Sequence, residues 1–211
     1  MKKKNIIIFG SSSHANEIVQ SLDKKKYNFL GFVEKKQKKK VRKLKIYCYE
    51  NDKKKLLKKN IFGIVGVYDL NIRKKIVTKV LLINPKFKFI SIISKNSLIS
   101  KKSKIGKDVF IANGVIINSN SEIKDHSVIN TGSIIEHDCI INRFVNISPN
   151  VTVLGNSVIF DEVLIGAGTV VKQNIKINEK NIIGSNSFVN KNINEKNKTY
   201  FGNPAKYYEK N

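Results

Sequence analysis

The sequence predicts a chain of two parts: an α/β part over residues 1–93 and an all-β parallel β-helix over residues 94–211. The second part is predicted by a repeat, because an Ile or Val recurs every six residues from Ile99 to Val189. A small or β-branched residue, such as Ser127 or Val145, stands four residues after most of them. This period fits neither a helix nor a lone strand. It is typical of a β-helix in which three short strands form each coil.

The first part reads as alternating strands and helices. The expected elements are strands over 5–9, 28–34, 61–67 and 87–93, a short extended segment over 44–49, and helices after Gly10, over 51–59 and over 71–82, with a loop over 35–45. Asp69 or Asn71 is expected to cap the last helix. This order predicts a Rossmann-like lobe, either three-layered or flavodoxin-like.

The first strand ends in a tight turn, Gly10-Ser11-Ser12-Ser13-His14-Ala15. A dinucleotide fingerprint needs a second glycine where Ser12 stands, so bound NAD is not expected. A helix N-terminus in this place can still bind a phosphate, although an ordinary βα turn explains the residues as well. Glu34 ends the second strand, where such sheets place acids that contact ligands.

The net charge of +24 is concentrated in residues 1–90, which carry +19. Nucleic-acid binding, steering of anionic substrates and a lysine-rich coding bias would each explain it. The lysine runs lack interleaved aromatics, which favours coding bias over a specific nucleic-acid site. We expect no signal peptide, because the apolar run 5–10 after Lys2–Lys4 is too short for an h-region. No apolar run reaches membrane-spanning length, and we expect a cytoplasmic protein. Cys48 and Cys139 show no metal spacing, and Cys139 is expected in the core.

Three motifs together resemble a known family. They are G-x-S-x-H at residues 10–14, N-T-G-S-I-I-E-H-D-C at 130–139 and G-N-P-A-K at 202–206. The chain resembles the hexapeptide-repeat sugar O/N-acyltransferases of the sialic-acid O-acetyltransferase type. Within these it is most similar to the N-acetyltransferases of UDP-4-amino-4,6-dideoxy sugars in bacillosamine synthesis. The resemblance implies a left-handed β-helix, an N-terminal lobe that holds the nucleotide sugar, and acetyl-CoA bound between the subunits of a homotrimer.

The resemblance also implies roles for particular residues. His137 is the expected catalytic base, with Asp138 and Asn130 beside it. The residues expected to contact the nucleotide sugar are Gly10, Ser12, His14, Glu34 and Lys35, and those expected to contact acetyl-CoA are Asn146, Gly155, Ala167, Ser185 and Pro204. An imidazole suits this chemistry, because an attacking amine must lose a proton near neutral pH. Glu136 and Asp138 both flank His137, and the family pattern favours Asp138 as its partner.

Two residues depart from the family pattern. Asn146 replaces a second histidine, and an amide cannot protonate anything. Lys35 replaces the second acid of an Asp-Asp pair, which bears on the identity of the nucleotide. His126 has an acidic neighbour on one side only, Asp125, and is expected at the surface. O-acetylation of a sialic-acid-like sugar and a non-catalytic basic scaffold are the competing functions.

Overall fold

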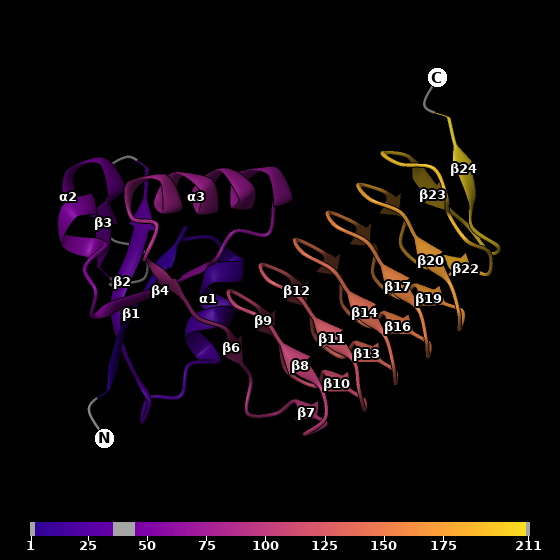
Figure 1. Cartoon of the computed structure of the whole chain (residues 1–211), viewed down its shortest axis with the longest axis horizontal. Helices are drawn as coiled ribbons and strands as arrows, with labels where there is room; N and C mark the ends of the chain where they lie inside the picture. The colour runs from indigo at the N-terminus through magenta and orange to yellow at the C-terminus, as the bar shows by residue number, and fades with distance from the viewer. Residues whose placement is uncertain (1–2, 36–44, 210–211) are drawn as a thin grey trace. The chain divides into compact units, whose positions relative to one another are not determined.

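The computed structural model describes residues 3–35 and 45–209. The chain divides into two compact units, Met1–Ile92 and Ile93–Asn211, which are described separately below (Figure 1). The loop expected over 35–45 lies almost wholly outside the described residues. None of the described helices is both long and apolar enough to cross a membrane.

The N-terminal unit contains one parallel sheet. Its strands are β1 (Lys4–Phe9), β2 (Tyr27–Glu34), β3 (Ile46–Cys48), β4 (Ile61–Val65) and β5 (Lys88–Phe89), in the order β3-β2-β1-β4-β5. Its helices are α1 (Ser13–Gln20), α2 (Tyr49–Leu56) and α3 (Leu70–Ile83). The central strand β1 lies between β2 and β4, and its Ile6, Ile7 and Ile8 are fully buried. The lobe is Rossmann-like as expected. A flavodoxin-like sheet would have the strand order 2-1-3-4-5, so the observed order shows that the flavodoxin-like alternative is wrong.

The helix and strand bounds differ slightly from those expected. Asp69 caps α3, since its carboxylate accepts the Ile72 N–H at 2.8 Å. The strand expected over 87–93 is two strands, β5 and β6 (Ile92–Ile93). They belong to different sheets, because β5 pairs with β4 whereas β6 joins a sheet of the β-helix. A continuous apolar run cannot reveal such a change of sheet.

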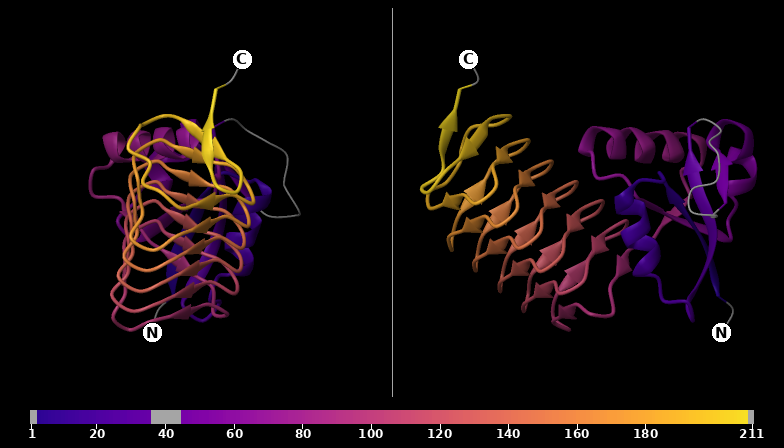
Figure 2. Two further views of the ribbon diagram at one scale, coloured as in Figure 1. Left: turned by 90° about the vertical axis from the view of Figure 1, so that its right-hand side faces the viewer. Right: turned by 180° about the vertical axis from the view of Figure 1, so that it is seen from behind.

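The second unit is a parallel β-helix with three sheets (Figure 2). The β7 sheet contains β7 (Leu98–Ile99), β10 (Ile116–Ile117), β13 (Ile134–Ile135), β16 (Thr152–Val153), β19 (Val170–Val171) and β22 (Phe188–Val189). The β8 sheet contains β8 (Lys104–Ile105), β11 (Glu122–Ile123), β14 (Ile140–Ile141), β17 (Val158–Ile159) and β20 (Lys176–Ile177). The β9 sheet contains β6, β9 (Phe110–Ile111), β12 (Val128–Ile129), β15 (Asn146–Ile147), β18 (Leu164–Ile165), β21 (Ile182–Ile183), β23 (Thr199–Phe201) and β24 (Lys206–Tyr208).

From β6 to β19, each strand pairs with the strand eighteen residues later, as at Ile117 and Ile135. The chain passes from the β7 sheet to the β8 sheet at the first corner, to the β9 sheet at the second, and back to the β7 sheet at the third. The coils stack from β7 to β22, and the β23–β24 hairpin follows at the C-terminal end (Figures 1 and 2).

The six-residue aliphatic column forms the core. Its residues from Ile111 to Val189 are all buried, whereas Ile99 and Ile105, in the first coil, are half-buried. Each fully buried Ile contributes roughly 1.5–3 kcal/mol. The repeat thus predicts the fold because each coil covers the apolar residues of its neighbour.

The residues that stand four positions after each aliphatic residue form a second column, and its hydrogen bonds explain the recurrent serines. Ser121 donates to the Glu136 carbonyl at 2.6 Å and accepts the Cys139 N–H at 3.0 Å. Ser127 makes the corresponding bonds with Asn142 and Val145. A buried hydroxyl needs such partners to offset its lost hydration. These serines therefore join one coil to the next.

Candidate functional site

The N-terminal unit contains a pocket of about 540 Å³ where the parallel strands β1 and β2 end. Four of the five residues expected to bind the nucleotide sugar line it: Gly10, Ser12, Glu34 and Lys35. Its apolar lining comes largely from Phe9, Val33, Tyr49, Ile72, Ile76 and Val80. A crevice at the carboxyl ends of parallel strands is the usual ligand site of such sheets.

Hydrogen bonds fix the polar side of this pocket. The Ser11 hydroxyl donates to the Glu34 carboxylate at 2.5 Å, which holds that carboxylate at the end of β2. The Ser12 side chain accepts the Ala15 N–H at the start of α1 and donates to the Gly66 carbonyl at 2.9 Å. Ser11 also lines the pocket, as do Lys75 and Lys79 of α3. Sequence reasoning did not assign a contact to any of these three. Lys75 and Lys79 could not be found in that way, because only the fold brings α3 beside the Gly10 turn.

Gly10 has a φ of +96° and lies against the β4–α3 loop. A Cβ added at Gly10 would meet a Val67 methyl group at 2.5 Å, closer than real Cβ atoms approach. Position 10 therefore requires glycine both for its backbone conformation and for its neighbour.

His14 does not line the pocket, unlike the other residues expected to contact the nucleotide sugar. It is partly buried, with its ring edge-to-face against Tyr68 at a centroid distance of 5.7 Å. Burial, together with the nearby Arg73 guanidinium, lowers the pKa of His14 to about 4. The imidazole is thus neutral at physiological pH and is suited to hydrogen bonding rather than to charge pairing.

His137 and Asp138 lie at a first corner of the β-helix, directly after β13. His137 Nδ1 is 2.9 Å from Asp138 Oδ2, and both side chains are about half exposed. Asp138 also accepts a hydrogen bond from Asn120 at 3.1 Å. These bonds, first the one from His137, lower the pKa of Asp138. An ionised carboxylate only accepts, so Nδ1 is the donor of this bond. In the neutral form of the ring with its proton on Nδ1, Nε2 offers a lone pair.

Gly155 lies one coil beyond His137 in the same corner column. A Cβ at Gly155 would be 2.6 Å from His137 Cε1 and 2.7 Å from Nε2. The imidazole therefore lies over bare backbone, and glycine is the residue that leaves room for it. Glu136, the other flanking acid, accepts a hydrogen bond from Asn118 at 3.0 Å.

The remaining candidates lie elsewhere on the coils. Asn130, Ala167 and Ser185 share the third corner, and the segment that contains Pro204 bonds to Phe188 through Gly202 and Ala205. Asn146 is on the β9 sheet and is 1% exposed. Within one chain, neither Asn130 nor Asn146 shares the corner of His137. The structure thus places Asn130, Ala167 and Ser185 at one edge of the β7 sheet and His137, Asp138 and Gly155 at the other, and Asn146 at neither edge.

His126 is not the surface residue that was expected. Its Nδ1 is 2.8 Å from Asp108 Oδ2, its side chain is 13% exposed, and its ring stacks on Phe144 at 4.6 Å. These three residues are eighteen apart in sequence, so they meet in one column of the second corner. This eighteen-residue spacing is the feature of the sequence from which the contacts of His126 could have been predicted. Cys139, by contrast, is buried as predicted, and burial raises its pKa to about 11.

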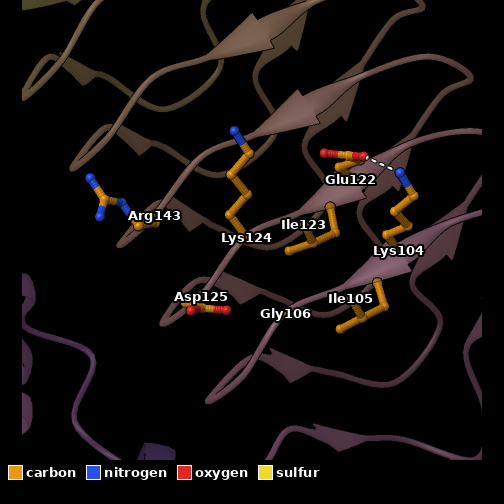
Figure 3. Close-up of a pocket in the computed structure, with 8 residues that line it drawn as sticks. All are labelled: Lys104, Ile105, Gly106, Glu122, Ile123, Lys124, Asp125 and Arg143. Carbon is orange, nitrogen blue, oxygen red and sulfur yellow. Dashed lines mark hydrogen bonds and ion pairs between the residues drawn. The ribbon is translucent and has the colours of Figure 1, made fainter.

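A smaller pocket of about 280 Å³ lies on the β8 sheet (Figure 3). Its cationic side chains have partners: Lys104 bonds Glu122 at 2.7 Å, Lys124 bonds Asn142 at 2.9 Å, and Arg143 bonds Asp161 at 2.8 Å. It contains none of the candidate residues, and we assign it no function. Among residues 3–35 and 45–209, no cluster of His, Cys, Asp or Glu is suited to hold a metal.

The fold and this site define a class of proteins: a Rossmann-type N-terminal domain joined to a hexapeptide β-helix. Residues 5–80 match the protein family described as the PglD N-terminal domain. No curated protein matches the chain.

Three solved structures share the fold over nearly their whole length. The acetyltransferase domain of PglB from Neisseria gonorrhoeae has 22% identity and a TM-score of 0.88, over 98% of this chain and 100% of that one. Perosamine N-acetyltransferase from Caulobacter crescentus, solved with CoA and GDP-perosamine, has 22% identity and a TM-score of 0.90, over 98% and 97%. WeeI from Acinetobacter baumannii has 23% identity and a TM-score of 0.84, over 96% and 99%. These likenesses confirm the predicted fold, an α/β lobe followed by a hexapeptide β-helix.

Proposed function

We propose that this protein is an acetyl-CoA-dependent N-acetyltransferase that acts on a nucleotide-linked amino sugar of the UDP-4-amino-4,6-dideoxy type. The observation that carries the proposal is the His137–Asp138 pair, held over Gly155 with Nδ1 facing the Asp138 carboxylate. The pocket around Gly10 and Glu34 supports the nucleotide part of the substrate. The solved structures with acetyl-CoA, or with CoA and GDP-perosamine, support the same class of reaction.

In this mechanism the sugar amine attacks the carbonyl carbon of the thioester directly. His137 Nε2 takes the proton that the amine loses as the C–N bond forms. The tetrahedral intermediate then collapses, the C–S bond breaks, and the imidazolium returns the proton to the departing thiolate. Asp138 keeps the ring in the required tautomer and stabilises the imidazolium.

We further propose that three copies of the chain complete the site. The corners that carry His137 and Asn130 flank the two sides of the β7 sheet. The first residues of its strands, which point outward, are all uncharged: Leu98, Ile116, Ile134, Thr152, Val170 and Phe188. In a trimer that turns this sheet toward its axis, His137 of one copy would approach the Asn130 corner of the next. Gly155, Ala167, Ser185 and Pro204 would then line the acetyl-CoA groove.

Purified full-length protein tests the activity directly. The protein is mixed with acetyl-CoA and a panel of UDP-, GDP- and CMP-linked amino sugars, and release of free thiol is recorded. Hydroxylamine then separates the two kinds of transfer, because it cleaves an acetyl ester and leaves an amide intact. An ester product would favour the O-acetyltransferase alternative, and no thiol release with any acceptor would favour the scaffold.

The general base is tested by His137→Ala. We expect kcat to fall on the order of 10²–10⁴-fold, with an unchanged melting temperature, because the ring is exposed and buries little apolar area. Lys107→Gln, an exposed residue of the second corner, is the matched control and should keep full activity. Near-normal turnover by His137→Ala from pH 6 to 9 would refute general-base catalysis by this residue.

A further inference from the structure

Arg73 is a buried cation in a position that disfavours cations. Its exposed fraction is 1%, and it lies in the first turn of α3. Burial removes a guanidinium from water, and the amino end of a helix carries partial positive charge. Both effects oppose a cation here. Interactions of the guanidinium must therefore offset both effects.

The guanidinium bonds to the chain immediately before its own helix. Nε donates to the Val67 carbonyl at 3.0 Å, and Nη2 donates to the Tyr68 carbonyl at 3.2 Å. Two donors in a rigid planar fork therefore fix two successive carbonyl groups. A lysine has a single ammonium on a flexible stem and cannot reproduce this geometry.

The segment that Arg73 holds, residues 66–69, contributes Val67 to the pocket wall. The Gly66 N–H donates to the Phe9 carbonyl at 2.8 Å, and the Gly66 carbonyl accepts from Ser12 at 2.9 Å. Val67 lines the pocket and touches Gly10. The next residue, Tyr68, packs against His14. The orientation of the Val67 and Tyr68 peptide units thus shapes the wall beside the Gly10 turn.

We infer that Arg73 is a positioning residue for nucleotide binding, acting through the carbonyl groups of Val67 and Tyr68. It holds Val67 in the pocket wall and touches none of the reacting atoms. The inference rests on the proposed function for the identity of the ligand. Its structural half, that Arg73 fixes segment 66–69, stands independently of that function.

The test compares Arg73→Lys with Val77→Ala in the full-length protein. Val77 is buried one turn further along α3, and its side chain has no polar group that could bond to segment 66–69. It is therefore a matched control for simple destabilisation of the helix. Binding of UDP and GDP is measured by calorimetry, and amide hydrogen exchange is followed over residues 61–73.

Arg73→Lys is expected to weaken nucleotide binding about tenfold, as for the loss of one charge-assisted hydrogen bond. Acetyl-CoA binding should not change. Exchange should rise specifically at Gly66 and its neighbours. Val77→Ala should lower the melting temperature at least as much as Arg73→Lys does, but it should leave the nucleotide affinity unchanged.

Three results would overturn the inference: unchanged exchange over 61–73 in Arg73→Lys, unchanged nucleotide affinity despite faster exchange, or an equal loss of affinity in Val77→Ala. If neither nucleotide binds the unmodified protein, the proposed acceptor class is wrong. The exchange comparison then still decides whether Arg73 holds the segment.

Discussion

At the residue scale, the orientation of His137 depends on a neighbour one coil away. The imidazole lies within 2.6–2.7 Å of the place where a Gly155 Cβ would stand. A methyl group there must push the ring aside, because real Cβ atoms do not approach other atoms that closely. Small displacements of a base cost much in rate, since proton transfer needs hydrogen-bond geometry.

Gly155→Ala is therefore expected to lower kcat by about 10-fold or more while the protein stays folded. Turnover and thermal melting of the purified variant check this. Gly114→Ala is not a suitable control, because its φ of +71° strains any side chain. Lys107→Gln is a better control, since it changes an exposed residue of the second corner, away from the candidate site. Full activity in Gly155→Ala would show that the ring is free to adopt another productive position.

His14 gives a prediction about pH. Its pKa is about 4 in the folded chain against 6.5 in the unfolded chain. Between these values the unfolded state binds a proton that the folded state excludes, so stability rises with pH across this window. The contribution of His14 to the free energy of unfolding is therefore fully present above pH 6.5. This contribution, roughly 3 kcal/mol, is lost as the pH falls toward 4.

The prediction can be checked by nuclear magnetic resonance, because the chain has three histidines. The His14 ring signals should titrate near pH 4. His14→Asn should also flatten the dependence of the unfolding free energy on pH between 4 and 6.5. Titration of His14 near 6.5 would contradict the burial of its ring.

At the scale of the element, each two-residue strand has one inward and one outward side chain. In β14, Ile141 is fully buried, whereas Ile140 beside it is half-exposed on the outer face of the β8 sheet. Both residues are isoleucines of the same strand, and they differ in the direction in which the side chain points. This alternation follows from the pleat of a strand.

Ile141→Lys is expected to prevent folding of the β-helix, because an unpaired buried ammonium costs several kcal/mol. Total stabilities are only about 5–15 kcal/mol. Ile140→Lys should fold and melt almost normally. Circular dichroism and thermal melting distinguish the two variants. A soluble Ile141→Lys variant with a cooperative transition at the usual temperature would mean that the inward phase is wrong.

At the scale of the whole molecule, the candidate residues on two edges of the β7 sheet predict a homotrimer. Sedimentation at micromolar concentration should give three times the chain mass of 24.0 kDa. Ile134→Lys, on the outer face of the β7 sheet, should dissociate the trimer, whereas Ile140→Lys on the β8 sheet should not. A monomer at all concentrations would remove the model of a shared site.

Much of this molecule follows from local sequence. The six-residue column from Ile99 to Val189 determines the β-helix, because each coil repeats the same inward contacts. Strand β1, the Gly10 turn and the Asp69 cap follow from apolar runs and short-range hydrogen bonds. The association of His137 with Asp138 was also open to prediction, since the two are adjacent.

Other features depend on contacts between residues distant in sequence. The strand order β3-β2-β1-β4-β5 is set by packing of the whole sheet, and the Ser11–Glu34 bond joins residues from separate strand ends. The Asp108–His126–Phe144 column and the space that Gly155 leaves for His137 arise from stacking of coils eighteen residues apart. The sequence by itself determined the repeating fold and the candidate base. Only the tertiary structure decided which side chains meet, because those contacts arise when the coils stack and the strands pair.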